Sequence, residues 1–254
     1  MKYLRDLAGA SERLELIALD LEKSSQEEFD KAVEGCTLVA HTASPFPAIE
    51  PKHEDELIKP AVNGTLSVLR AAAKASTVKK VVVTSSVAAV GESGDKTRGE
   101  KDWTDLTKPT GAYVKSKTLA EKAAWDFVAE NKPSWSLCTI NPAFVLGPTI
   151  GPERGSSMEV GARLLRGEMP MLPKISFGVV DVRDVARAHI KALQAPPESV
   201  NGRRFILYRE SLWVRDMAHA MAKVFGPLGY SIPKMEVSFN VVIKINLPWK
   251  SNDF

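Results

Sequence analysis

Residues 79–86 read KKVVVTSS and predict the centre of the fold. Three consecutive valines favour a β-strand, because β-branched side chains pack well on a pleated surface. The run is apolar on both faces rather than alternating, which is typical of a strand covered on both sides in a parallel sheet. Two serines follow at its carboxyl end, where open parallel sheets bind ligands. The stretch therefore predicts a buried central strand with a polar site at its end.

Segments of two kinds alternate on either side of this stretch. Short runs rich in Val, Ile and Leu predict strands, and longer runs with apolar residues three or four positions apart predict helices. This alternation indicates parallel strands joined by crossover helices, and so an α/β fold with a doubly wound parallel sheet. The expected strands cover residues 14–19, 37–41, 80–85 and 136–141, and the expected helices cover residues 26–33, 57–75 and 112–131.

The pattern changes after Pro142, where proline and glycine become frequent. Helices are expected over residues 157–166, 182–195 and 212–225, and residues 229–254 give no assignable pattern. We therefore expect residues 1–145 to form the sheet domain. Residues 146–254 are expected to form mainly a smaller lobe, with some elements returning to the sheet.

Charge and composition restrict the class of partner. The 34 basic and 31 acidic residues are scattered, with a formal net charge of +3, so no charged block predicts nucleic acid or an anionic membrane as a partner. No stretch resembles a secretion signal or approaches the roughly 18 apolar residues of a membrane span. Cys36 and Cys138 lie beside apolar runs, which favours buried thiols in a reducing compartment. A cytoplasmic protein with a small-molecule ligand is expected.

Residues 113–117, with the sequence YVKSK, provide the strongest candidate site. Residues four apart on a helix share one face, so Tyr113 and Lys117 can reach one ligand together. The alternative is a solvated helix face without catalytic role. Ser86, at the end of the valine strand, is expected to face the same crevice. Its alternative role is in turn formation at the strand end.

Further stretches carry a resemblance to a known family. In order and spacing, the chain resembles the extended short-chain dehydrogenase/reductase family, on LVAHTASP (38–45), VNGT (62–65), TSS (84–86), YVKSK (113–117), NPAFVLGP (141–148) and VDVRDVA (180–186). Within that family, LDL (19–21), GC (35–36) and HTASP (41–45) most resemble the dihydroflavonol reductase and cinnamoyl-CoA reductase branch. The resemblance implies a Rossmann-like NAD(P)-binding domain followed by a small substrate-binding lobe.

The resemblance also implies a catalytic group. Tyr113 would be the general acid that gives its proton to a carbonyl oxygen. Lys117 would lower the pKa of that phenol and hold the nicotinamide ribose. Ser86 would hydrogen-bond the substrate oxygen. Asn63 would hold a water molecule in a proton relay, or would be structural.

A cofactor site is implied as well. Asp20 would accept a hydrogen bond from the adenine amino group, although an aspartate at a strand end is also a common turn residue. Leu21 would pack against the adenine ring. His41 is better explained as a packed strand residue than as a base. The remaining expected contacts are Thr42, Ala43 and Ser44 beside the adenosine half, and Pro142 and Val145 beside the nicotinamide.

One feature of the family is not found in this sequence. Dinucleotide sites of this kind use a glycine-rich turn that brings backbone N–H groups close to the pyrophosphate. No such motif occurs here, since Gly9 stands alone and the next glycine is Gly35. We expect that a strand, a helix and a second strand of roughly 40 residues are missing at the N-terminus. Relatives favour NADP(H) over NAD(H), and we adopt that expectation.

The preferred function is an NAD(P)H-dependent reductase or dehydrogenase that interconverts a ketone or aldehyde and its alcohol. One alternative is an impaired remnant of the family with a binding role, and another is a nucleotide-sugar epimerase or dehydratase. Asp181, Arg183 and Asp184 are more simply structural, through a helix cap and ion pairing. The histidines and cysteines show no metal-ligand spacing. A monomer or homodimer is expected.

Overall fold

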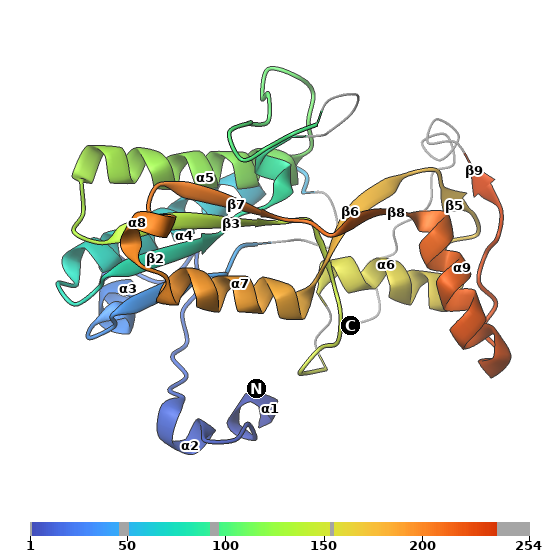
Figure 1. The fold of residues 1–254 in the computed structure, drawn as a ribbon, viewed down its shortest axis with the longest axis horizontal. Helices are drawn as coiled ribbons and strands as arrows, with labels where there is room; N and C mark the ends of the chain where they lie inside the picture. Colours follow the sequence, from blue (N-terminus) through green and yellow to red (C-terminus); the bar gives the residue numbers. More distant parts are fainter. Residues whose placement is uncertain (1, 46–50, 92–96, 153–154, 238–254) are drawn as a thin grey trace. The chain divides into compact units, whose positions relative to one another are not determined.

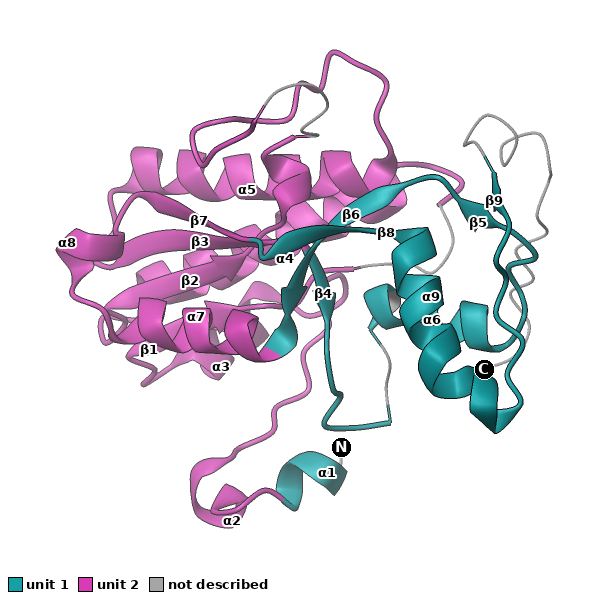
Figure 2. Ribbon diagram, turned by 45° about the vertical axis from the view of Figure 1, so that its right-hand side comes forward, with its two compact units in different colours: residues 1–6, 144–182, 208–254 teal, residues 7–143, 183–207 magenta. Residues whose placement is uncertain are grey.

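The structure, a computed structural model, describes residues 2–45, 51–91, 97–152 and 155–237. The chain forms two compact units (Figure 2). The sheet unit consists of residues 7–143 and 183–207, and the second unit consists of residues 1–6, 144–182 and 208–254. The segment 183–207 thus belongs to the sheet unit although it follows part of the second unit in sequence.

A parallel sheet forms the centre of the sheet unit (Figure 1). Within it, His41 pairs with Val83, and Thr84 pairs with Ile140. Because the strands are parallel and in this register, their carboxyl ends meet at one edge of the sheet. The expected α/β fold with a parallel sheet is confirmed. The strands lie in the order β1 (Leu38–His41), β2 (Lys80–Thr84), β3 (Ser136–Pro142) and β7 (Arg203–Leu207).

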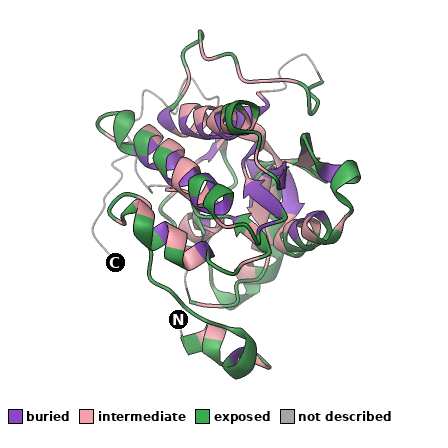
Figure 3. Ribbon diagram, turned by 90° about the vertical axis from the view of Figure 1, so that its left-hand side faces the viewer, coloured by how far each residue is buried: buried purple, intermediate pink, exposed green. Residues whose placement is uncertain are grey.

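Helices cover both faces of this sheet, as Figure 1 shows for α5 above and α7 below. Val81 and Val83 of β2 face a core shared with α3, α4 and α5, whereas Val82 faces α7 and α8. Buried residues are concentrated in the strands and on the inward sides of the helices (Figure 3). These helices are α3 (Gln26–Val33), α4 (Asp55–Lys74), α5 (Ala112–Asn131), α7 (Val182–Gln194) and α8 (Pro197–Val200).

The helices expected over residues 26–33 and 112–131 are confirmed with those bounds. The start of α3 follows from its sequence, because Ser25 and Glu28 form a capping box that satisfies free N–H groups of the first turn. Helix α4 begins two residues earlier than the expected segment 57–75, at Asp55.

The strand expected over residues 14–19 is wrong. Within the described ranges this segment pairs with no strand, and Leu14, Leu16, Ile17 and Leu19 are 40%, 36%, 55% and 37% exposed. A strand is stabilised by hydrogen bonds to a neighbouring strand, so an apolar run without a neighbour does not form one. Two short helices that the sequence pattern did not predict precede it, namely α1 (Lys2–Arg5) and α2 (Ala10–Arg13).

The second unit contains a small mixed sheet that the sequence pattern also did not predict. Strand β6 pairs in parallel with β4 and antiparallel with β8. Residue Leu212, expected to begin a helix, lies in β8 instead, and the helix begins at Val214. Val214 and Ala218 pack with Leu164 and Leu172 in the core of this unit. The elements are β4 (Phe144–Leu146), α6 (Ser156–Leu165), β5 (Leu172–Pro173), β6 (Ser176–Asp181), β8 (Glu210–Trp213), α9 (Val214–Phe225), the 3-10 helix η2 (Gly226–Leu228) and β9 (Glu236–Val237).

Lys80, the first residue of β2, links the sheet to the C-terminal end of α7 by hydrogen bonds. It is 4% exposed, and its Nζ donates hydrogen bonds to the carbonyl oxygens of Ala192 and Leu193, both at 3.0 Å, and to that of Ala195. Carbonyl groups in the last turn of a helix have no intrahelical partner. The ammonium satisfies them and also lies at the negative end of the helix dipole.

We predict that Lys80→Met lowers the free energy of unfolding by about 2–4 kcal/mol, because buried carbonyl groups lose a charged donor. Urea denaturation followed by circular dichroism measures this change. The matched control is Lys79→Met, whose lysine precedes the strand and is exposed; its effect should stay within about 0.5 kcal/mol. Equal stability of the two variants would contradict the role of Lys80.

Candidate active site

Ser86 and Tyr113 lie together where β2 ends and α5 begins. Ser86 is 8% exposed and is the N-cap of the 3-10 helix η1 (Val87–Ala89), where its Oγ accepts a hydrogen bond from the backbone N–H of Ala88 at 3.1 Å. The side chains of Ser86 and Tyr113 are also hydrogen-bonded to each other. Two hydroxyl groups from distant parts of the sequence therefore meet in one place.

Lys117 lies one helical turn after Tyr113 on α5 and is 8% exposed. It lines a small cavity at the carboxyl ends of β1 and β2, together with His41, Thr65 and Ser85. Neither a hydrogen bond nor an ion pair reaches its ammonium from the described residues. Burial lowers the pKa of Lys117 to about 8, although the Glu121 carboxylate acts in the opposite direction. The cavity thus contains a buried cation that can accept a polar ligand.

The pKa of Tyr113 differs from the sequence-based expectation. Lys117 was expected to lower it, but burial raises the pKa of the phenol above its ordinary value of 10.0, and the hydrogen bond with Ser86 offsets only part of that effect. At neutral pH the phenol therefore keeps its proton. This is the form in which a general acid can donate.

His41 is a packed strand residue whose ring also lines the cavity. Its Nε2 lies 3.1 Å from Oγ1 of Thr65 on α4. Burial, with a smaller contribution from the Lys117 charge, lowers the pKa of His41 to about 4. The ring is therefore neutral at physiological pH and leaves Lys117 as the cation of the cavity.

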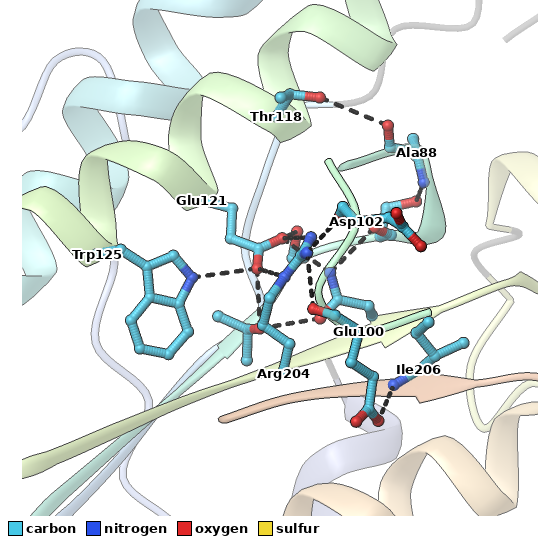
Figure 4. Close-up of polar contacts among 12 residues, drawn as sticks. Ala88, Glu100, Asp102, Thr118, Glu121, Trp125, Arg204 and Ile206 are labelled. Atoms are coloured by element: carbon cyan, nitrogen blue, oxygen red, sulfur yellow. Dashed lines mark hydrogen bonds and ion pairs between the residues drawn. The ribbon is translucent and has the colours of Figure 1, made fainter. Parts of the chain in front are cut away.

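A buried polar cluster surrounds Glu121, which also lines the cavity (Figure 4). Glu121, four residues after Lys117 on α5, is 1% exposed and forms an ion pair with Arg204 of β7, in which Oε1 and Nε are 2.6 Å apart. Neither residue was selected from the sequence, nor was Thr65. Glu121 could have been found, because its four-residue spacing from Lys117 places both on one helix face. Arg204 carries no comparable signal in the sequence.

The residues expected to bind the adenine side have local partners. Asp20 is exposed, and its Oδ1 accepts hydrogen bonds from the N–H groups of Glu22 and Lys23 at 2.9 and 3.1 Å, which lower its pKa. This is the turn that the sequence allowed as an alternative. Leu21 packs on the core beneath α4, where a Cβ atom at Gly64 would lie 3.0 Å from the Leu21 side chain. A Cβ atom at position 64 would therefore require the Leu21 side chain to shift by a few tenths of an ångström.

The other expected cofactor contacts occupy two places. Ala43 and Ser44 line the cavity beside Lys117, whereas Thr42 is exposed. Pro142 ends β3 and is buried in the sheet unit, and Val145 is half-buried in β4 of the second unit. Their roles in binding stay predictions.

Asn63 lies on α4 at an exposed position, and it is Thr65, two residues later, that lines the cavity. The structure therefore brings together Ser86 with Tyr113, places Lys117 one turn along the same helix, and leaves Asn63 outside the cavity. A relay through Asn63 stays a prediction.

A family model described as the NAD dependent epimerase/dehydratase family matches residues 4–207. The chain belongs to this family. The match confirms the resemblance to extended short-chain dehydrogenases/reductases, and the curated relatives lie in the branch expected from residues 19–21 and 41–45. A cinnamoyl-CoA reductase of Medicago truncatula is 43% identical over 215 residues, which cover 82% of this chain and 64% of that protein. Vestitone reductase of Medicago sativa is 37% identical over 213 residues, covering 81% of this chain and 63% of that enzyme.

Solved structures agree with these sequence relatives. The yeast methylglyoxal/isovaleraldehyde reductase Gre2 complexed with NADPH matches with a TM-score of 0.72 at 29% identity, covering 89% of this chain and 75% of that chain. Vestitone reductase from alfalfa matches with a TM-score of 0.70 at 30% identity, covering 98% of this chain and 81% of that chain. The chain spans less than two thirds of the length of the two relatives matched by sequence, the cinnamoyl-CoA reductase and vestitone reductase of Medicago.

The described residues include no group of three or more His, Cys, Asp or Glu side chains that could hold a metal ion. None of the described helices is long and apolar enough to cross a membrane.

We predict that Lys117→Met raises the free energy of unfolding at pH 7 by up to about 3 kcal/mol, because the variant no longer buries an ammonium. Between the folded pKa of about 8 and the ordinary value of 10.5, the unfolded chain binds more protons than the folded chain. The stability of the unsubstituted protein should therefore rise toward that of the variant as the pH increases across this interval.

Urea denaturation at pH 7 and at pH 10 measures the difference. Lys115→Met is the control, because Lys115 pairs with Glu54 at a distance of 2.5 Å on a more exposed part of the same helix; its effect should be below about 1 kcal/mol. A loss of stability in Lys117→Met at pH 7 would disprove the interpretation.

Proposed function

We propose that this protein reduces a ketone or aldehyde with NADPH, and that Ser86, Tyr113 and Lys117 form the catalytic group. The single observation that carries the proposal is the grouping of a protonated phenol, a hydroxyl hydrogen-bonded to it and a buried ammonium one turn along the same helix. The reductase names of its relatives, and the NADPH in one of the similar structures, support the same reaction.

The residues at the cavity fit the nicotinamide-ribose half of such a cofactor. Lys117 provides an ammonium that lacks a partner from the described residues and can donate to ribose hydroxyls. Ala43 and Ser44 have small side chains, which permit a ligand to approach the backbone after β1. Residues 1–254 contain no glycine-rich turn for the pyrophosphate half. NADPH affinity is therefore the first quantity to measure.

Each residue of the group has a distinct task. The chemistry that bound NADPH supplies is a hydride for the carbonyl carbon. Ser86 orients the carbonyl oxygen by hydrogen bonding and stabilises the negative charge that develops on it. Tyr113 donates its phenolic proton to that oxygen, which completes the alcohol. The Lys117 ammonium then stabilises the phenolate that remains.

Direct titration of the chain with NADPH distinguishes the reductase from a remnant of the family. Saturation at micromolar concentration, as is common for enzyme cofactors, supports the reductase, whereas the absence of saturation at millimolar concentration supports the remnant. Isothermal calorimetry provides the measurement without requiring a substrate.

We predict that Tyr113→Phe lowers the rate of NADPH oxidation with aromatic or aliphatic carbonyl compounds by about 100- to 10,000-fold, because the general acid is lost. Its affinity for NADPH should stay within about twofold, since the change removes one hydroxyl from a site dominated by other contacts. Tyr230→Phe, a change at a 48% exposed tyrosine in the second unit, should leave the rate unaltered. Equal rates in Tyr113→Phe and the unsubstituted protein would remove Tyr113 from the mechanism.

A further inference from the structure

The Glu121 carboxylate is fully buried, and each of its two oxygens accepts several hydrogen bonds (Figure 4). Oε1 accepts hydrogen bonds from Trp125 Nε1 at 3.2 Å, Thr139 Oγ1 at 3.0 Å and Arg204 Nε at 2.6 Å. Oε2 accepts from Ser85 Oγ at 2.5 Å, Asn141 Nδ2 at 2.8 Å and Arg204 Nη2 at 3.2 Å. The two-pronged contact with Arg204 fixes the geometry of the ion pair.

Apart from Trp125 of α5, these donors come from adjacent strands of the sheet or, for Ser85, from the residue directly after β2. The register pairs Thr139 with Arg204, and alternate residues of a strand share one face, so Ser85, Thr139, Asn141 and Arg204 all face α5. Nearer the start of the same face, the side chains are apolar, as at Val81 and Leu137. One face of the sheet therefore changes from an apolar core to a polar cluster where the proposed catalytic residues lie.

The cluster holds the backbone of Ser86. Asn141 Nδ2 donates to the carbonyl oxygen of Ser86 at 3.1 Å while it also donates to Glu121. Ser85, the preceding residue, is tied by its hydroxyl to Glu121 and by its N–H to the carbonyl of Ile140 at 2.8 Å. The turn that presents Ser86 to Tyr113 is thus fixed on both sides of the Ser85–Ser86 peptide.

The cluster also faces Lys117. Glu121 follows Lys117 by four residues on α5, and both lie against the cavity. The other titratable groups beside Lys117 are His41 on β1, which is neutral at physiological pH, and the Tyr113 phenol, which is protonated. Arg204 of β7 is paired with Glu121 and is not among the residues that line the cavity. The negative charge that opposes the desolvation of the Lys117 ammonium is therefore that of Glu121.

Arg204 extends the cluster to the segment that follows residue 97. Its Nη1 donates to the carbonyl oxygen of Glu100 at 3.0 Å and to that of Asp102 at 2.5 Å. Its guanidinium lies 3.8 Å from the centre of the Trp103 ring, and Glu100 Oε1 accepts from the N–H of Ile206 at 3.2 Å. The donors of Arg204 are thus distributed between Glu121 and this segment, which leaves the guanidinium fixed in position.

A buried ion pair adds little net stability, because removing both charges from water offsets most of their attraction. Apolar residues of similar volume would often serve the fold as well or better. What the pair provides here is a fixed negative charge and fixed hydrogen-bond acceptors beside Ser86 and Lys117.

We propose that Glu121, held by Arg204, is a positioning residue that fixes the Ser85–Ser86 turn and keeps the Lys117 ammonium protonated. This inference rests on the proposed function for its purpose, since Ser86 and Lys117 are the groups that it serves.

The test is competitive acetylation of Lys117 across pH 6–11, read by mass spectrometry of the peptide that contains it. In the unsubstituted protein the midpoint should lie near pH 8. In Glu121→Gln it should fall by about one pH unit, because an attractive charge next to the ammonium is lost while Arg204 stays charged. In Glu121→Gln combined with Arg204→Met the fall should be smaller, since both charges are removed.

Two control variants separate charge from packing. Glu121→Asp keeps the charge and should return the midpoint most of the way toward that of the unsubstituted protein. Glu54→Gln removes a carboxylate that pairs with Lys115 on the same helix and should leave the midpoint of Lys117 unaltered. An unchanged Lys117 midpoint in Glu121→Gln and in its double variant with Arg204→Met would overturn the proposal. A shift in Glu54→Gln as large as that in Glu121→Gln would overturn it too.

Hydrogen–deuterium exchange in the same variants tests the second part. Peptides that cover residues 84–91 should exchange faster than in the unsubstituted protein in both Glu121→Gln and its double variant with Arg204→Met. Peptides of α9 in the second unit should exchange at an unaltered rate. Should Glu121→Gln lose cooperative unfolding, the double variant with Arg204→Met, which leaves no unpaired guanidinium, gives the same measurements. Unchanged exchange at residues 84–91 would show that Glu121 does not hold the turn.

These measurements need neither cofactor nor turnover, so they separate the two proposals. A shifted labelling midpoint without NADPH binding would leave Glu121 as the determinant of Lys117 charge and would disprove the reductase. NADPH oxidation with an unshifted midpoint would leave the reductase and disprove the positioning role.

Discussion

Parallel, in-register pairing of β1, β2 and β3 is the constraint from which the rest of the sheet unit follows. It sets the carboxyl ends of three strands side by side, so that His41, Ser85 and Asn141 reach the same edge although about a hundred residues separate the first from the last. Helix α5 crosses over that edge and adds Tyr113, Lys117 and Glu121. A one-residue slip of β2 would exchange its two faces and direct Ser85 away from the carboxylate.

Much of this arrangement could be predicted from sequence, because its elements are defined by local patterns. The valine run of β2 predicted the central strand of the sheet. The helical spacing of α5 predicted that Lys117 lies one turn after Tyr113. The segment 14–19 has an equally apolar pattern and forms no strand, since strand formation depends on a neighbour that local sequence does not report. Arg204 was missed for a related reason. Its importance arises from a partner more than eighty positions away.

The site illustrates how function opposes stability. A buried lysine without a partner from the described residues lowers the stability of the fold, and a buried ion pair contributes little to it. Both lie beside the cavity, where charge is useful for binding and proton transfer. Lys80 differs from Lys117 although it lies in the same sheet unit. Its ammonium is also buried, but it donates hydrogen bonds to carbonyl groups in the last turn of α7. Burial alone therefore does not distinguish the two lysines; the difference is that Lys117 lines a cavity and Lys80 does not.

The close approach of Leu21 to Gly64 has a consequence for how this chain can vary. A glycine in the middle of α4 weakens the helix by about 1 kcal/mol relative to alanine, so drift toward alanine would be favoured on local grounds. The leucine opposes that drift, because an added methyl group would lie only 3.0 Å from its side chain. The two positions are consequently expected to co-vary across descendants of this sequence, with a larger residue at 64 accepted more readily where a smaller one stands at 21.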